Sequence, residues 1–216
     1  MQVIEKFVSI NGEGLKQGEL ALFLRFKGCN LRCSYCDTLY SFINPKYKEE
    51  SIDEIIEFVK EKNIKNITIT GGEPLIQEDI NELLERLINL NYNVEIETNG
   101  SILIKDYVNN KNISYTLDYK LPGSLMENKM NLDNYRYISK KDSVKFVCKD
   151  YNDLLKMKEI INKYDLINIT NCIVSPVFNE INLEDIVNFL IDNNLNGVKM
   201  QLQIHKIIWD PNKRGV

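Results

Sequence analysis

The chain has 216 residues, of which 44% are hydrophobic and 27% charged, and its formal net charge is −4 at pH 7. This composition predicts one globular domain, residues 1–216, with a sizeable core. No apolar run reaches the ~18 residues of a membrane span and the first residues do not resemble a signal peptide, so we expect a cytoplasmic protein. The acidic balance argues against nucleic-acid binding.

Short apolar segments alternate with longer segments of helical periodicity along the chain. Strands are expected at residues 21–26, 66–70, 93–98, 113–120, 143–149, 167–176 and 198–206. Helices are expected at residues 51–63, 77–91, 153–164 and 183–194. The first of these helices begins with Ser51 followed by Glu54, which is the pattern of a capping box.

This β-α order predicts an α/β fold with a mostly parallel sheet and right-handed crossovers. Six or so strands are too few for an eightfold barrel, so we expect a partial (open) TIM-like β/α barrel with a reduced set of helices. A doubly wound open sheet is the alternative. In both folds the site lies at the carboxyl ends of the strands. Unusual short sequences follow five predicted strands, namely GCNLRC, GGEP, TNG, DYKLPG and SPVF.

Three of the five cysteines, Cys29, Cys33 and Cys36, form the pattern C-x3-C-x2-C. Cys148 and Cys172 lie in apolar segments and are expected to be buried in strands. Three thiolates are one fewer than a structural zinc site needs, although His205, the single histidine, could supply a fourth ligand. A [4Fe–4S] cluster with three cysteine ligands instead keeps one iron open for a small molecule.

The cysteine pattern, with Tyr35 before the last cysteine, resembles the signature of the radical S-adenosylmethionine (SAM) superfamily. The resemblance implies a [4Fe–4S] cluster whose open iron chelates SAM, and a 5′-deoxyadenosyl radical formed after one-electron reduction. Residues 71–74, GGEP, are similar to the second element of the superfamily, which contacts the methionyl ammonium. A tight turn that starts a helix at Pro74 is compatible with that role.

Four further stretches resemble the 7-carboxy-7-deazaguanine synthases, and the likeness runs over nearly the whole chain. They are SINGEG at residues 9–14, Cys-Asp-Thr at 36–38, DYKLPGS at 118–124 and LQIHKIIW at 202–209. The resemblance implies a lyase of queuosine and deazapurine biosynthesis. It converts 6-carboxy-5,6,7,8-tetrahydropterin to 7-carboxy-7-deazaguanine and ammonia by radical ring contraction. It also implies Mg²⁺, a homodimer and an external flavodoxin- or ferredoxin-like electron donor.

The same resemblance assigns roles to individual residues of this chain. The cluster ligands are Cys29, Cys33 and Cys36, and the magnesium ligand is Thr38. SAM is expected to contact Tyr35, Cys36, Asp37, Gly72, Glu73, Glu97, Asn99, Asp118, Tyr119, Lys120, Ser175, Pro176, Val177 and Phe178. The substrate is expected to contact Ile10, Asn11, Gly12, Glu13, Arg25, Thr70, His205 and the carboxylate of Val216.

Several of these roles have a simpler structural alternative. Thr38 could cap a turn, and Asn11-Gly12 could form a two-residue hairpin turn. Arg25 could lie exposed on an edge strand, and Glu97 could form a salt bridge to a neighbouring strand. Two other functions also stay open: an activase that generates a glycyl radical on a partner protein, and a zinc- or cluster-binding structural or redox module.

Overall fold

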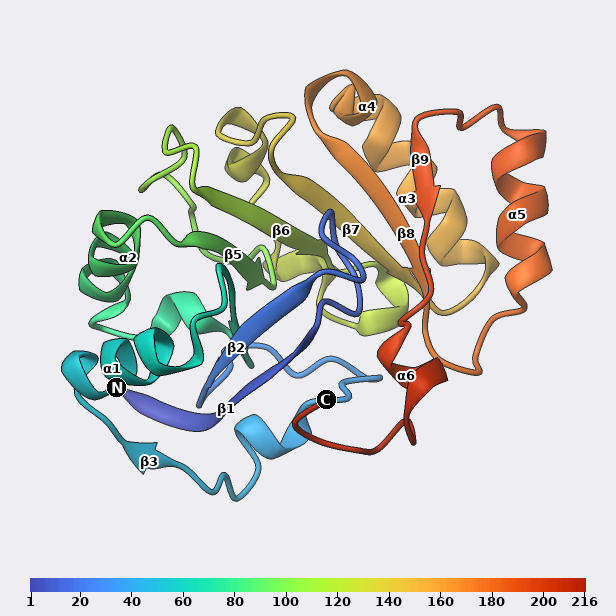
Figure 1. Cartoon of the computed structure of the whole chain (residues 1–216). Helices are drawn as coiled ribbons and strands as arrows, with labels where there is room; N and C mark the ends of the chain where they lie inside the picture. Colours follow the sequence, from blue (N-terminus) through green and yellow to red (C-terminus); the bar gives the residue numbers. More distant parts are fainter.

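The computed structural model describes all residues, 1–216, and contains one nine-stranded sheet of order β3-β1-β2-β4-β5-β6-β7-β8-β9 (Figure 1). The strands are β1 (Gln2–Ile10), β2 (Leu20–Phe26), β3 (Lys48–Glu49), β4 (Asn66–Gly71), β5 (Asn93–Thr98), β6 (Ile113–Tyr119), β7 (Ser143–Cys148), β8 (Asn171–Pro176) and β9 (Val198–Met200). From β2 to β9 all neighbours are parallel, whereas β1 is antiparallel to both β2 and β3. The predicted open, mostly parallel sheet is confirmed, with nine strands in place of six or so.

The helices are α1 (Ile52–Lys62), α2 (Ile80–Asn89), α3 (Tyr151–Lys163), α4 (Leu166–Ile169), α5 (Leu183–Asp192) and α6 (His205–Ile208). The longer helices α1, α2, α3 and α5 lie along the outside of the curved sheet, whereas α6 lies near the end of the chain, against the loop between β1 and β2 (Figure 1). Short 3-10 helices are η1 (Leu39–Ser41), η2 (Pro74–Ile76), η3 (Pro122–Ser124), η4 (Glu127–Lys129) and η5 (Leu132–Arg136). The predicted capping box at Ser51 and Glu54 is present. None of the helices has the length and apolarity that a membrane crossing requires.

Two predicted strands are shorter than the sequence suggested. Residues 167–169 belong to α4, because the Thr170 N–H donates to the Leu166 carbonyl oxygen at 2.8 Å and closes one helical turn. The last strand stops at Met200. After the Gln201 N–H donates to the Val174 carbonyl oxygen at 2.9 Å, the chain leaves the sheet for the loop between β1 and β2. Strand β1 was not predicted.

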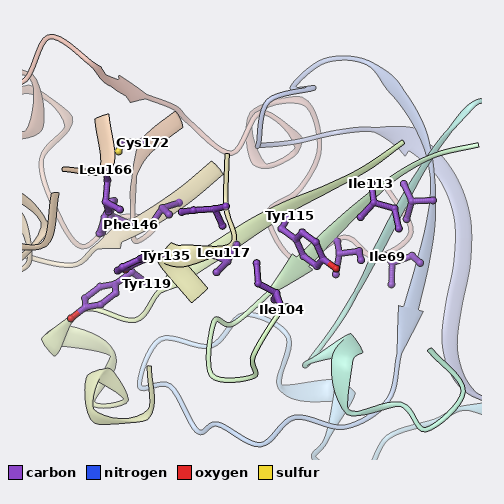
Figure 2. Packing of buried hydrophobic residues seen from close by; sticks show 14 of the residues in the cluster. Ile69, Ile104, Ile113, Tyr115, Leu117, Tyr119, Tyr135, Phe146, Leu166 and Cys172 are labelled. Carbon is purple, nitrogen blue, oxygen red and sulfur yellow. The ribbon is translucent and has the colours of Figure 1, made fainter. Parts of the chain in front are cut away.

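The two faces of the sheet differ in polarity because side chains alternate along each strand. Ile113, Tyr115, Leu117 and Tyr119 of β6 are buried in the core beneath the helices (Figure 2). The rings of Tyr119 and Phe146 pack with their centroids 5.8 Å apart. Both strand cysteines, Cys148 and Cys172, are fully buried in the same core, as predicted. The intervening residues of each strand face the concave side.

Candidate active site

The concave face of the sheet is polar along four neighbouring strands. The side chains that alternate with the core residues of β4 to β7 are Thr68, Thr70, Glu95, Glu97, Thr116, Asp118, Ser143 and Lys145. Most of them are buried, although they point away from the helices. Two segments make contacts on this face: the β1–β2 loop, residues 11–19, and residues 201–206, which we call the strap.

The loop that follows β2 carries the three cysteines, and we call it the cysteine loop or cluster loop. Cys29, Cys33 and Cys36 are half-buried free thiols, and burial raises the pKa of Cys33 and of Cys36. Three soft thiolate donors on one loop fit an iron–sulfur cluster, in which each binds a separate iron. No three His, Cys, Asp or Glu side chains are grouped as ligands for one metal ion, which a zinc site would require.

Neighbouring segments pack closely around this cysteine loop. A Cβ on Gly72 would lie 2.3 Å from the Gly28 carbonyl oxygen and 2.5 Å from the Cys29 Cβ, so only glycine allows this approach. The Ser34 N–H donates to the Ser124 carbonyl oxygen of η3 at 3.1 Å. The Asn99 side chain donates to Asn30 Oδ1 at 2.9 Å and lies 3.8 Å from Cys29 Sγ. The sequence-predicted Gly72 and Asn99 therefore both contact the cysteine loop.

Glu73 connects the ends of two strands. Its carboxylate accepts hydrogen bonds from the Leu75 N–H at 3.0 Å, the Thr98 hydroxyl at 2.9 Å and the Asn99 N–H at 2.7 Å. Burial raises the pKa of Glu73 to about 7, against the effect of these donors. Because the side chain is fully buried and fully engaged, any contact of Glu73 with SAM is limited to its backbone. The predicted turn at Pro74 is present as η2.

The β1–β2 loop is longer than a two-residue Asn-Gly turn, so that alternative is wrong. The Asn11 N–H donates to the Glu19 carbonyl oxygen at 2.8 Å and closes a loop over residues 11–19. Asn11 Oδ1 accepts from the Thr68 hydroxyl at 2.7 Å, and the Asn11 amide nitrogen is buried without a partner. Glu13 Oε2 accepts from Lys145 Nζ at 3.1 Å, while Glu13 Oε1 is buried without a partner.

The strap joins the β1–β2 loop through several hydrogen bonds. Gln17 Nε2 donates to the carbonyl oxygens of Gly12 at 3.0 Å and Leu202 at 2.7 Å. The Ile204 N–H donates to the Gly12 carbonyl oxygen at 3.2 Å. The imidazole of His205 packs on Gly12, where an added Cβ would lie 2.0 Å from Nδ1. The structure therefore brings the predicted residues Gly12, Glu13 and His205 together.

Arg25 lies on β2, between β1 and β4, so the edge-strand alternative is wrong. Its Nε donates to Glu5 Oε1 at 2.7 Å, and the Tyr40 hydroxyl donates to the same oxygen at 3.1 Å. The Arg214 guanidinium carbon lies 3.6 Å from the centroid of the Tyr40 ring. The last residues of the chain, which end at Val216, thus approach the Arg25 group.

Asp118 and Lys120 lie on either side of Tyr119, the last residue of β6. Lys120 Nζ donates to Asp118 Oδ2 at 2.8 Å, and Lys145 Nζ lies 3.2 Å from Asp118 Oδ1. Tyr119 points the opposite way, into the core, and its hydroxyl donates to Glu127 at 2.8 Å. A contact between Tyr119 and SAM could therefore involve only the backbone.

Oxygen donors gather after the last cysteine of the cluster loop. The Thr38 hydroxyl donates to Asp37 Oδ1 at 2.9 Å, and Lys206 of the strap lies 3.0 Å from Asp37 Oδ2. A hydroxyl oxygen beside a carboxylate fits Mg²⁺, which takes oxygen ligands and retains several waters. The lone pairs of the Thr38 oxygen stay available, because it acts as the donor in its bond to Asp37.

The carboxyl end of β8 lies beside that of β7. The Val177 N–H donates to the Cys148 carbonyl oxygen at 2.8 Å, and the Tyr35 hydroxyl donates to the Val147 carbonyl oxygen at 3.1 Å. The Ser175 hydroxyl is buried without a partner, whereas Phe178 is 43% exposed. The predicted residues 175–178 thus extend the same edge that Tyr35 reaches.

Sequence reasoning missed several members of the site. Lys145, Glu95 and Thr116 are buried polar residues on the concave face, and Gln201 anchors the strap. The signal was the period of two: within SVKFVC, Lys145 is a charged residue between core residues Val144 and Phe146. A charged residue at such a position points to the face opposite the core.

Three comparisons with known proteins point to the same family. The radical SAM superfamily profile matches residues 24–192. A 7-carboxy-7-deazaguanine synthase of Clostridium acetobutylicum is 52% identical over 100% of this chain and 99% of its own length. Another, from Thermoplasma acidophilum, is 35% identical over 97% of each chain. The crystal structure of QueE from Escherichia coli shares the fold, with a TM-score of 0.74 at 18% identity over 93% of this chain and 92% of that one.

The superfamily profile, the sequence relatives and the shared fold all agree with an iron–sulfur cluster bound by the three cysteines of the loop that follows β2. The [4Fe–4S] cluster and SAM, which the superfamily implies, fit the thiolates of that loop. The chain belongs to the radical SAM superfamily and, within it, to the family of 7-carboxy-7-deazaguanine synthases.

Proposed function

We propose that this enzyme converts 6-carboxy-5,6,7,8-tetrahydropterin to 7-carboxy-7-deazaguanine and ammonia by radical ring contraction. The observation that carries the proposal is a buried, unpartnered carboxylate oxygen, Glu13 Oε1, on the concave face of the sheet, where Glu13 pairs with Lys145. A pterin carries N–H donors on its amino-pyrimidinone edge that suit such an acceptor. The relatives named above carry the name of this activity.

The chain's own residues bind and orient the reactants. Cys29, Cys33 and Cys36 hold the cluster, which together with SAM supplies a 5′-deoxyadenosyl radical when both are bound. The residues that we propose to surround SAM lie at the carboxyl ends of β4 to β8 and on the cluster loop. They are Tyr35, Cys36, Asp37, Gly72, Glu73, Glu97, Asn99, Asp118, Tyr119, Lys120, Ser175, Pro176, Val177 and Phe178. Glu73 and Tyr119 contribute backbone atoms only.

Substrate groups are recognised by the β1–β2 loop, the strap and residues of β2 and β4. Glu13 accepts from the pyrimidinone edge, and Ile10, Asn11 and Gly12 place that loop. Thr70 and His205 are proposed to line the walls of the substrate-binding site. The guanidinium of Arg25 and the terminal carboxylate of Val216 act at the polar periphery of the substrate. Thr38, beside Asp37, is proposed to hold Mg²⁺ against the substrate carboxylate, an arrangement that uses hard oxygen donors.

We also propose the compartment, the electron donor, the oligomeric state and the domain organisation of the enzyme. Thiolate ligation of a cluster requires reduced cysteines, which suits a cytoplasmic enzyme. An external one-electron donor of the flavodoxin or ferredoxin type would reduce the cluster. Family resemblance supports a homodimer. One continuous hydrophobic core supports a single domain over residues 1–216.

The test is an anaerobic assay with the reconstituted enzyme, SAM, a strong reductant, Mg²⁺ and 6-carboxytetrahydropterin, followed by mass spectrometry. We expect 7-carboxy-7-deazaguanine with SAM unconsumed. SAM cleavage without the deazaguanine would reject this substrate and favour the activase alternative.

A matched set of cysteine variants tests the cluster assignment. Cys29→Ala should lose bound iron and the brown colour of the cluster, because one of three ligands is removed. Cys172→Ala removes an equally small thiol from the core of β8 and should retain both. A Cys29→Ala variant that still cleaves SAM would contradict the assignment.

A further inference from the structure

We infer that Lys145 is a positioning residue that couples the SAM-binding edge of the sheet to the substrate-binding β1–β2 loop. The inference rests on the proposed function, because it takes Asp118 to face SAM and Glu13 to face the substrate. Lys145 lies on β7. Its Nζ donates a hydrogen bond to Glu13 Oε2 at 3.1 Å and lies 3.2 Å from Asp118 Oδ1, as an ion pair without hydrogen-bond geometry. One ammonium group therefore contacts a carboxylate from each part of the site.

The position of Lys145 is tightly defined. The residue is 7% exposed, and the side chains of Glu13 and Asp118 are 10% and 22% exposed. Burial alone would lower the pKa of Lys145, but Asp118, Glu13 and Glu97 together raise it well above its usual value. The side chain is therefore an ammonium, and its loss would leave two largely buried carboxylates without their shared cation.

The ion pairs form a continuous path between the two parts of the site. Lys120 donates to the second oxygen of Asp118 at 2.8 Å, and Lys145 links Asp118 to Glu13. Gln203 of the strap also donates to Glu13 Oε2 at 3.2 Å, whereas Glu13 Oε1 has no partner in the protein. An interaction that fixes Asp118 thus fixes Lys145, and Lys145 fixes the carboxylate that stays available to the substrate.

The expected consequence is positive coupling between SAM binding and ordering of the β1–β2 loop. Since coupling free energies are reciprocal, substrate should also raise the affinity for SAM. A merely structural ion pair would behave differently. Its removal would lower stability, but SAM would still affect the loop as it does in the wild type.

The experiment compares hydrogen–deuterium exchange of residues 12–16 in the reconstituted protein with and without SAM. In the wild type, SAM should slow exchange of this loop at least about fivefold, the lower end of ordinary coupling. In Lys145→Met, which keeps most of the length of the side chain without its charge, SAM should have no effect on the loop. Lys145→Arg, which keeps the charge, should restore part of the protection.

The matched control is Lys141→Met. Lys141 pairs with Asp142 at 3.3 Å at the other end of β7, so this variant also loses a lysine ion pair but lies away from the site. It should retain the wild-type protection by SAM. Equal protection by SAM in Lys145→Met and in the wild type would overturn the inference. So would a wild-type loop that does not respond to SAM.

A second variant keeps the inference testable if Lys145→Met does not fold. Glu13→Gln leaves Lys145 paired with Asp118 and removes only the charge on the loop side. It should still bind SAM in equilibrium dialysis without substrate, but about fivefold more weakly than the wild type, because the coupling is reciprocal. The protection of the loop by SAM should be lost. Retained protection would count against the inference. Because the exchange readout needs no pterin, a failed turnover assay would reject the proposed substrate without affecting this result.

Discussion

Gln201 and Gly14 exchange two hydrogen bonds between the strap and the β1–β2 loop. Gln201 Nε2 donates to the Gly14 carbonyl oxygen at 2.9 Å, and Gln201 Oε1 accepts from the Gly14 N–H at 3.0 Å. The side-chain amide thus pairs with the backbone as a neighbouring strand would. Since Glu13 directly precedes Gly14, this pair helps to fix the height of Glu13 above the sheet.

Gln201→Ala should therefore weaken substrate binding. Loss of the two hydrogen bonds should raise KM for the pterin about tenfold, or about 1.4 kcal/mol, with kcat changed less. Steady-state kinetics at saturating SAM measures this. Gln2→Ala, which removes an exposed amide that donates to Glu49, is the control and should match the wild type. An unchanged KM for Gln201→Ala would show that the loop holds its position without the strap.

Gly12→Ala should separate His205 from the β1–β2 loop. The added Cβ would lie 2.0 Å from Nδ1 of His205, so either the loop or α6 must move. We expect KM to rise at least about tenfold, since the pair lies on the proposed substrate side. Gly18→Ala is the control on the same loop. Its φ of +86° costs about 1 kcal/mol of stability for alanine, but nothing lies within 4 Å of the new Cβ and KM should not change.

Thr38→Val should weaken the response to Mg²⁺. The substitution keeps the shape of the side chain and removes the hydroxyl oxygen that we propose as a ligand. The Mg²⁺ concentration for half-maximal turnover should rise about tenfold, the size of a lost ligand or partner of a metal. Iron content should be unchanged. Ser34→Ala, which removes another hydroxyl of the cluster loop, should keep the wild-type Mg²⁺ dependence.

Glu95 should make stability fall as pH rises from 4.5 to about 7. Burial raises its pKa from 4.5 to about 7, and its Oε2 has no partner. A carboxyl that binds its proton more tightly in the folded state stabilises the fold fully below the unfolded pKa. That contribution, about 3 kcal/mol, is lost as pH rises through the folded pKa.

Denaturant unfolding at several pH values between about 5 and 8 measures this effect. In Glu95→Gln, which keeps the acceptor for Thr116, the fall in the free energy of unfolding should be smaller than in the wild type. Some fall should persist, because the pKa of Glu73 is also raised to about 7. Glu61→Gln on the exposed surface should follow the wild type. Parallel curves for Glu95→Gln and the wild type would contradict the assignment.

The sequence could predict the elements whose signals are local. Ser51 and Glu54 lie three positions apart, and the capping box they predict is present. The cluster loop could be predicted for the same reason, because its three cysteines lie close together in the sequence. Strand β1 was missed, although Glu5, Phe7 and Ser9 face the same side as Arg25, Phe23 and Ala21 of β2. That alternation identifies a strand only when the antiparallel pairing of β1 with β2 is known.

The missed parts of the site depend on contacts between distant segments. Lys145 has its role because Glu13 and Asp118 approach it from two other segments. The apolar neighbours of Gln201 predict a strand at this position. Gln201 leaves the sheet because its side chain pairs with Gly14. No local pattern contains either partner.

The Gln201–Gly14 pair also bears on the order in which the protein folds. The two residues are 187 positions apart in the chain, whereas neighbouring parallel strands are joined by far shorter connections. Contacts of such long sequence separation are slow to form, since the intervening chain must first be ordered. During synthesis the cysteine loop leaves the ribosome early, and the strap follows only after β9. The sheet can therefore assemble while the concave face is still accessible, and the covering of the site is among the last steps of folding.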